Sequence, residues 1–324
     1  LVGSEMCIRD SSNIDMNAIQ TIMYTSGTTS NPKGCPLSHK NVLHVANSMV
    51  DRWKMNDKDV FWDPSEYFVN DYEVVNIELS DENIALNSWW LDAQNNNGPT
   101  VLVLHGLGSG KHSPDMLLTA GMLYKNGFNV LAIDFRDHGE STCEDGFHSA
   151  GQKESDDVVA SLDWIVNEKG ISADNIGIYG SSLGALVGLL TPSKSNNFSA
   201  LAVLDAPFDF ETLVREELIY QGFSELLWTP LYHYVLIFEG INLLANNPED
   251  SLKAGNKQPI LIFNGMDNDR VLPHHTDDLI DSATEIGIEL EINRYEELGH
   301  TRVLYDYPKE FSIKLVQFFS RHLS

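Results

Sequence analysis

A glycine-flanked serine is the strongest chemical signal in the sequence. Residues 180–184 read Gly-Ser-Ser-Leu-Gly, so Ser182 lies between two glycines in a Gly-x-Ser-x-Gly pattern. An apolar strand pattern over 176–179 precedes it, and a helical pattern over 183–190 follows it directly. A serine on such a turn is exposed at the N-terminus of a helix, whose dipole favours developing negative charge. We therefore expect Ser182 to be a nucleophile and Ser181 to be a neighbour without that role.

A serine hydroxyl needs a general base, and the base needs an acid that orients it. His300 follows the last predicted strand, 289–294, and precedes the last predicted helix, 307–323. Of the eleven histidines, it alone occupies such a place, and the glycine before it suits a loop that reaches across to the serine. We predict that His300 is the base, whereas His105 is expected to be a structural loop residue.

Two adjacent histidines, His274 and His275, open a predicted helix and are expected to be surface residues. Adjacent histidines without a third ligand nearby do not make a metal site. The sequence therefore predicts no metal site, and the expected chemistry needs no organic cofactor.

The candidate acid lies in the segment 264–273, which follows a predicted strand. This segment resembles the acid loop of the α/β-hydrolases, often Gly-x-x-Asp-x-x-Val-Pro, with one more residue between Gly265 and the final proline. Counting back from that proline selects Asp269, whereas counting from Gly265 leaves Asp267 possible. We favour Asp269 as the acid.

Backbone amides are expected to hold the oxyanion. Residues 105–108 read His-Gly-Leu-Gly and follow the predicted strand 100–104. In the α/β-hydrolases the loop after this strand supplies one N–H, and the residue after the nucleophile supplies the other. The resemblance therefore assigns the oxyanion hole to the N–H groups of Leu107 and Leu183.

The elements that must position these residues alternate between strand and helix from residue 72 onward. The segments 72–79 and 84–91 predict two antiparallel strands, and the continuous apolar run at 100–104 predicts a strand buried on both faces. Further strands are predicted at 129–135, 176–179, 201–204, 259–263 and 289–294, and helices at 115–124, 154–168, 183–190, 277–286 and 307–323. This order predicts an α/β fold with a mostly parallel, doubly wound sheet.

An insertion of about forty residues at 208–248 interrupts this alternation. It has helical spacing and many aromatic residues, which is typical of a lid or cap. We predict a modest helical cap in which Phe223, Trp228 and Tyr232 form walls of the substrate pocket. The alternative is extra helical packing on the flank of the sheet.

The first 65 residues differ in character from the remainder. Residues 24–34 read Tyr-Thr-Ser-Gly-Thr-Thr-Ser-Asn-Pro-Lys-Gly, which resembles the phosphate-binding loop of the adenylate-forming acyl-CoA synthetases. Residues 1–11 resemble a translated sequencing adapter. We therefore interpret the chain as a metagenomic chimera, in which residues 1–65 form no functional domain and residues 66–324 form the catalytic domain.

Charge and composition exclude several classes of partner. Asp and Glu number 47 against 21 Lys and Arg, a net charge of −26 that repels nucleic acid and anionic lipid. The apolar stretch 226–245 contains Pro230, His233 and Glu239, which argues against a membrane span. The three cysteines form no disulfide framework, which predicts a cytoplasmic protein. Oligomeric state is left open.

Together the motifs resemble those of the α/β-hydrolase superfamily. Residues 129–141 and 151–157 are similar to the lysophospholipase-like and serine-aminopeptidase-like members. That resemblance implies a Ser-Asp-His triad and an acyl-enzyme intermediate, and the aromatic cap favours a small-molecule ester of an apolar acyl or alkyl group. The alternatives on the same triad are a thioesterase and a serine peptidase. From other classes, a non-catalytic hydrolase-fold binding protein and an ATP-dependent acyl ligase are alternatives.

Overall fold

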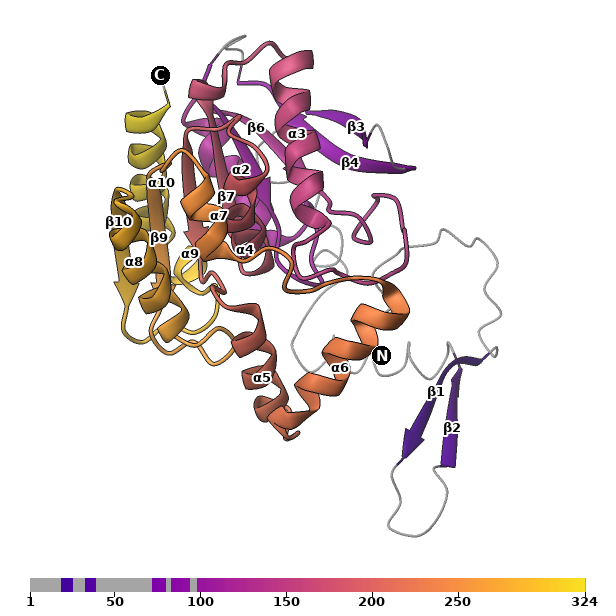
Figure 1. The fold of residues 1–324 in the computed structure, drawn as a ribbon. Coiled ribbons are helices and arrows are strands. Elements are labelled where there is room, and N and C mark those ends of the chain that lie inside the picture. The colour runs from indigo at the N-terminus through magenta and orange to yellow at the C-terminus, as the bar shows by residue number, and fades with distance from the viewer. Residues whose placement is uncertain (1–18, 26–32, 39–71, 80–82, 94–97, 324) are drawn as a thin grey trace. The chain divides into compact units, whose positions relative to one another are not determined.

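The computed structural model describes residues 19–25, 33–38, 72–79, 83–93 and 98–323. The chain divides into two compact units, residues 8–62 and residues 63–324 together with 1–7. In the first unit, β1 (Ile19–Thr25) pairs antiparallel with β2 (Lys33–Ser38) (Figure 1). Most of the connecting phosphate-loop-like segment, 26–32, lies outside the described residues, as does the predicted domain boundary at residue 65.

An eight-stranded sheet forms the centre of the second unit (Figure 1). Its strand order is β10-β9-β8-β7-β5-β6-β4-β3. The strands from β10 to β6 in this order are parallel, whereas β4 pairs antiparallel with both β6 and β3. The strands are β3 (Glu73–Leu79), β4 (Ile84–Leu91), β5 (Thr100–Leu104), β6 (Asn129–Ile133), β7 (Ile176–Ser181), β8 (Ala200–Leu204), β9 (Ile260–Gly265) and β10 (Leu290–Tyr295).

Helices cover both faces of the sheet. One layer contains α3, α4, α7 and α8, which pack against one another in that order, and the other contains α2, α9 and α10. The helices are α2 (Pro114–Lys125), α3 (Glu154–Glu168), α4 (Leu183–Leu190), α7 (Pro248–Ala254), α8 (His274–Ile286), α9 (Val303–Asp306) and α10 (Pro308–His322). The α/β fold predicted from the sequence is confirmed.

Burial explains why the central strands were readable as apolar runs. Every residue of β5, β6, β7, β8 and β9 is buried, because helices cover both of their faces. In β3, at the edge, buried residues alternate with exposed ones, since only one face is covered. The order of the sheet also brings the segments after β7, β8, β9 and β10 to the same edge, where they can form one site.

The insertion between β8 and α7 is helical, as predicted. It contains α5 (Phe210–Tyr220), a 3₁₀ turn η4 (Glu225–Leu227), α6 (Trp228–Tyr234) and a π-helical turn η5 (Val235–Glu239). Figure 1 shows α5 and α6 projecting from the body of the sheet and its covering helices. We call residues 208–247 the cap.

Two further expectations concern the membrane and the cysteines. Among the described residues, no helix is long and apolar enough to cross a bilayer. Cys143 is disulfide-bonded. This differs from the expectation that the three cysteines form no disulfide framework.

Candidate active site

The predicted nucleophile lies on a tight turn between β7 and α4. Ser182 has φ 53° and ψ −115°, in the left-handed region that side chains seldom adopt. A Cβ atom on Gly180 would lie 2.3 Å from the carbonyl oxygen of Gly184, and one on Gly184 would lie 2.3 Å from that of Leu104. The two glycines are therefore required by the close approach of strand and helix, which holds Ser182 at the end of the sheet.

The predicted base meets the predicted nucleophile. His300 lies in the loop after β10, and its Nε2 is 3.0 Å from Ser182 Oγ. This is the hydrogen-bond distance at which an imidazole can take a proton from an attacking hydroxyl. Burial lowers the pKa of His300, and the positive charge of Arg270 lowers it further, while Asp205 and Asp269 act in the opposite direction. The imidazole is thus neutral near pH 7, as a base must be.

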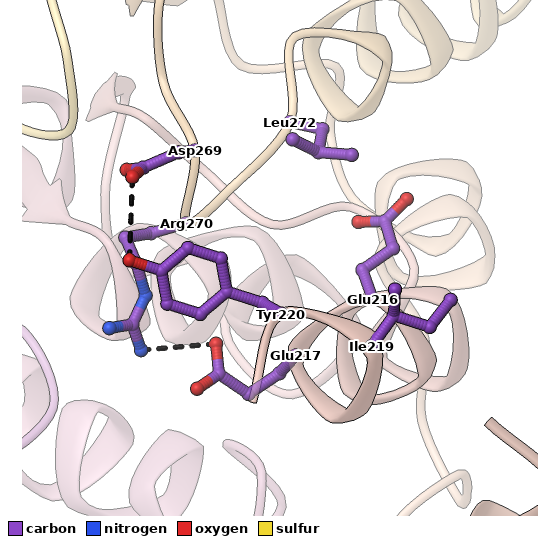
Figure 2. Close-up of a pocket in the computed structure, with 7 residues that line it drawn as sticks. All are labelled: Glu216, Glu217, Ile219, Tyr220, Asp269, Arg270 and Leu272. Carbon is purple, nitrogen blue, oxygen red and sulfur yellow. Dashed lines mark hydrogen bonds and ion pairs between the residues drawn. The ribbon is translucent and has the colours of Figure 1, made fainter. Parts of the chain in front are cut away.

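The predicted acid does not contact this histidine. Asp269 is exposed, and its Oδ2 lies 3.5 Å from the hydroxyl of Tyr220 on the cap (Figure 2). The alternative, Asp267, is also exposed. The residue between them, Asn268, is buried and places its Nδ2 3.0 Å from His300 Nδ1. The structure thus places neither carboxylate against His300, because the loop turns position 268 inward and both neighbouring carboxylates outward.

A buried carboxylate that the sequence did not reveal lies near the same nitrogen of the imidazole. Asp205 directly follows β8, and its Oδ2 is 3.9 Å from His300 Nδ1. Its oxygens accept hydrogen bonds from the backbone N–H groups of Gly265 at 2.9 Å and Thr301 at 2.6 Å, and from the Asn264 amide at 3.1 Å. Burial raises the pKa of Asp205, and these donors together with His300 oppose the rise.

The two predicted oxyanion donors lie beside the nucleophile. Leu183 is the first residue of α4, so its N–H belongs to the first turn, which has no intrahelical acceptor. The loop after β5 approaches closely, since a Cβ on Gly106 would lie 3.4 Å from Ser182 Cβ. Leu107 and Leu183 both line the cavity that contains Ser182. His105 is structural as predicted: it is buried, with Nδ1 2.8 Å from the Gly106 carbonyl oxygen and Nε2 accepting from Phe135 N–H.

A cavity of about 580 Å³ opens beside the serine and the histidine. Its apolar lining comes from both the cap and the body of the domain. The apolar lining residues are Leu107, Leu183, Leu186, Pro207, Phe210, Leu213, Val214 and Val271. The polar residues that share the cavity are Ser182, His300, His148, Glu217 and Arg270.

The structure does not place the three predicted wall residues on this cavity. Phe223 is 59% exposed, and Trp228 is 3% exposed inside a small apolar cluster of the cap with Leu243. The hydroxyl of Tyr232 lies 3.0 Å from the side-chain oxygen of Asn242. Trp228 thus packs within the cap and against Ala150 of the body, and the pocket wall comes instead from the first turns of α5.

An ion pair separates this cavity from a second, smaller one. The neighbouring pocket of about 310 Å³ is lined by Tyr220, Asp269 and other residues shown in Figure 2. Arg270 lies 3.1 Å from Glu217 and stacks over the Tyr220 ring, and both Arg270 and Glu217 also line the first cavity. These contacts connect the acid loop to α5 of the cap.

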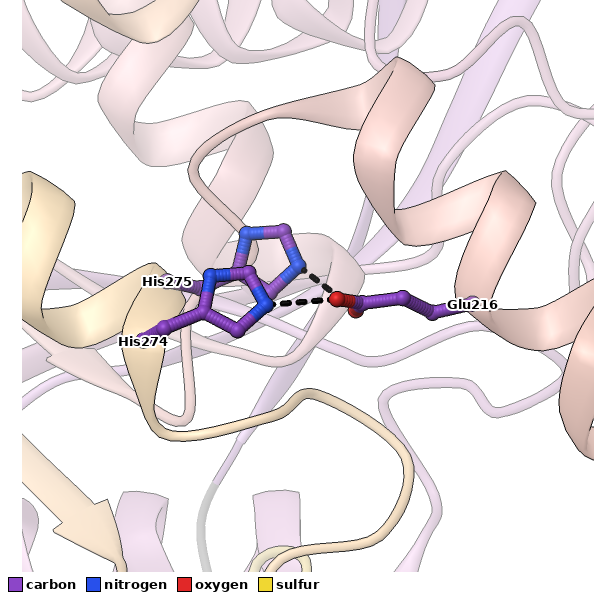
Figure 3. Close-up of side chains that lie close together, drawn as sticks. All are labelled: Glu216, His274 and His275. Carbon is purple, nitrogen blue, oxygen red and sulfur yellow. Dashed lines mark hydrogen bonds and ion pairs between the residues drawn. The ribbon is translucent and has the colours of Figure 1, made fainter.

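A second contact between cap and body involves the two adjacent histidines. Glu216 of α5 lies between the Nε2 atoms of His274, at 2.5 Å, and His275, at 3.2 Å (Figure 3). The expectation that no third group lies near these histidines is therefore wrong. His275 Nδ1 accepts from the backbone N–H groups of Phe208 and Asp209, which leaves the proton on Nε2, directed at Glu216. This arrangement fits hydrogen bonding rather than metal ligation, for which Nε2 would need a free lone pair.

Two protein-family models match different parts of the chain. The sequence model of the prolyl oligopeptidase family matches residues 114–324. That of the AMP-binding enzymes matches residues 5–78, the part of the chain that carries the synthetase-like loop. The two matches agree with the resemblances found at the two ends of the sequence.

Individual relatives are similar to a large part of the chain. Acylamino-acid-releasing enzyme 1 of Oryza sativa subsp. japonica is 23% identical over 70% of the chain and 30% of its own length. The alpha/beta hydrolase domain-containing protein WAV2 of Arabidopsis thaliana is 26% identical over 63% of the chain and 64% of its own. The chain thus spans less than two thirds of either relative. The esterase Pf2001 of Pyrococcus furiosus has the same fold, with a TM-score of 0.64 and 24% identity over 81% of the chain and 97% of the esterase.

Proposed function

The chain belongs to the prolyl oligopeptidase family and is an α/β-hydrolase, and on this basis we propose that it cleaves carboxylic esters of apolar acyl groups at Ser182. The observation that carries the proposal is the 3.0 Å contact between Ser182 Oγ and His300 Nε2 in the lining of a largely apolar cavity. A small-molecule substrate fits a cavity of this size and lining.

The proposed reaction is acyl transfer in two steps. His300 takes the proton from Ser182 as Oγ attacks the acyl carbonyl, and the N–H groups of Leu107 and Leu183 receive the oxyanion. The alcohol leaves with the proton from His300. Water then attacks the acyl-enzyme with His300 again as base, and the acid is released.

The apolar wall of α5 supports an ester with an apolar acyl chain. We predict that Leu213→Ala changes the ratio of kcat/KM between octanoate and acetate esters roughly ten-fold, the effect of losing about 1–3 kcal/mol of apolar contact. Ile219→Ala, on the same helix but 58% exposed and away from this cavity, is the matched control. Trp228→Ala should lower all rates together, because it removes the core of the cap. A uniform loss for Leu213→Ala would contradict the assigned wall.

A thioesterase or peptidase on the same residues is the second candidate. It is favoured by the rice relative, which is named an acylamino-acid-releasing enzyme. A panel of p-nitrophenyl esters, acyl-CoA thioesters and aminoacyl anilides separates the three activities. We expect the highest kcat/KM with the esters, and a preference for anilides would replace the proposed substrate class.

Residues 1–65 are proposed to contribute no catalytic function. Their resemblance to acyl-CoA synthetases stops within a short segment, whereas an adenylating site needs an adenine pocket and a mobile C-terminal domain. We predict that a chain beginning at residue 66 retains its ester turnover, and that the full chain releases no pyrophosphate from ATP and a fatty acid. Loss of folding or of turnover in the shorter chain, compared by circular dichroism and initial rates, would contradict this division.

A further inference from the structure

Two groups with opposite hydrogen-bonding demands face the same nitrogen of His300. To act as a base toward Ser182, the imidazole must keep its Nε2 lone pair free and carry its proton on Nδ1. A proton on Nδ1 requires an acceptor there. The neighbours of Nδ1 are the amide nitrogen of Asn268 at 3.0 Å and the carboxylate of Asp205 at 3.9 Å.

The orientation of the Asn268 amide is fixed by its own loop. Its Oδ1 accepts the backbone N–H groups of Arg270 and Val271, each at 3.0 Å. Turning the amide over would direct its NH₂ at these two donors and leave them without an acceptor. Asn268 therefore presents a donor to His300 Nδ1. This contact favours the imidazole tautomer with its proton on Nε2, which cannot take a proton from Ser182.

Asp205 favours the opposite tautomer, with the proton on Nδ1 of His300. Its carboxylate is buried, and its Oδ2 lies about 1 Å beyond hydrogen-bond distance from His300 Nδ1. A negative charge at this distance in a buried site stabilises an imidazolium strongly. It also accepts a proton on Nδ1 if the imidazole turns slightly away from Asn268.

We propose that Asp205 is the positioning carboxylate for His300, and that Asn268 restrains the reaction by holding the imidazole in the unproductive tautomer. The inference rests on the proposed serine hydrolase function. The chain is then a hydrolase whose rate is set by competition at one nitrogen atom. Asn268 lies three residues after Gly265 and three before Val271, the place of the carboxylate in Gly-x-x-Asp-x-x-Val.

Four proteins test the proposal: the natural chain, Asn268→Asp, Asp205→Asn, and the double variant. Asn268→Asp keeps an oxygen for the loop N–H groups and offers a second to His300, so we expect kcat to rise at least about 10-fold. Asp205→Asn should lower kcat about 10²-fold with little change in KM, less than the ~10⁴-fold known for a directly bonded triad Asp→Asn change. In the Asp205→Asn background, Asn268→Asp should restore kcat to the natural level or above.

Two readouts separate a positioning role from a merely structural one. Because the charge of Asp205 raises the pKa of His300, Asp205→Asn should move the ascending limb of kcat/KM to lower pH, and Asn268→Asp should move it to higher pH. Imidazole ¹⁵N NMR should find the His300 proton on Nε2 in the natural chain and on Nδ1 in Asn268→Asp.

The outcomes distinguish this inference from the function on which it rests. Loss in Asp205→Asn without rescue in the double variant would make Asp205 a purely structural anchor and overturn the proposal. Equal turnover of Asn268→Asp and the natural chain would also overturn it, even if Asp205→Asn failed to fold. If a fluorophosphonate labelled Ser182 in neither the natural chain nor Asn268→Asp, the proposed hydrolase function would be wrong, and the inference would be wrong with it.

Discussion

Ser182→Ala should abolish ester hydrolysis, with a loss in kcat of at least about 10⁴-fold, while Ser181→Ala retains most of the activity. The two hydroxyls are adjacent in sequence but differ in surroundings. Ser182 Oγ meets the base at 3.0 Å and lines the cavity, whereas Ser181 is 1% exposed and its hydroxyl has no hydrogen-bond partner among the described residues. Removing a buried hydroxyl without a partner costs little.

Initial rates on a p-nitrophenyl butyrate series measure this contrast. Circular dichroism of both variants controls for folding, because Ser182 has a strained backbone that alanine must also adopt. A Ser182→Ala protein with near-normal turnover would end the assignment of the nucleophile. Inactivation by Ser181→Ala alone would move the assignment to the neighbouring residue.

Lys111→Met should lower the free energy of unfolding by about 3–5 kcal/mol, the cost of leaving a buried charge without its partner. Lys111 Nζ lies 2.6 Å from Asp134 Oδ2, and both side chains are fully buried. Burial raises the pKa of Asp134, but Lys111 and His105 outweigh it and hold that pKa below its ordinary value. The carboxylate therefore stays charged near pH 7. The stability it contributes is lost only as the pH falls through this lowered pKa.

The ion pair between Lys111 and Asp134 lies next to the loop that lines the active-site cavity. Lys111 follows the loop that carries Leu107, and the backbone N–H of Lys111 also donates to Asp134, at 2.6 Å. Lys253→Met is the matched control, since Lys253 pairs with Glu249 on the surface of α7. Urea unfolding should give an unchanged midpoint for Lys253→Met and a strongly lowered one for Lys111→Met. Equal midpoints would show that the buried pair contributes no net stability.

The fold was predictable because its central strands are continuous apolar runs in the sequence. The apolar run at 100–104 and the strand pattern before Ser182 correspond to β5 and β7, and both are buried throughout. The positions of Ser182 and His300 in the fold were predictable for a related reason. Each follows a recognisable strand and precedes a recognisable helix, so their places at the edge of the sheet were fixed by the alternation itself.

The groups that lie near His300 Nδ1 were not predictable in the same way. Counting back from Pro273 placed the extra residue of the loop before the carboxylate, whereas the structure fits an extra residue, Leu272, between Val271 and the proline. Counting forward three residues from Gly265 would have reached Asn268. Asp205 could have been found only with the strand order, which puts the end of β8 next to those of β7 and β9.

The cap shows a different limit of sequence reasoning. An aromatic residue in the middle of an inserted helical segment can face the substrate or form the segment's own core. Trp228 packs with Phe210 and Tyr232 of the cap and belongs to an apolar cluster that also includes Ala150 of the body, which joins the projecting helices to the domain. Helical periodicity alone does not distinguish these two faces.

The central claim is that Ser182 is an activated nucleophile, and fluorophosphonate labelling followed by peptide mapping tests it most directly. The account predicts one phosphonylated residue, Ser182, with labelling lost in Ser182→Ala and retained in Ser181→Ala. Labelling should rise with pH as His300 becomes neutral. Absence of labelling in the folded natural chain, or a label on another residue, would contradict the account.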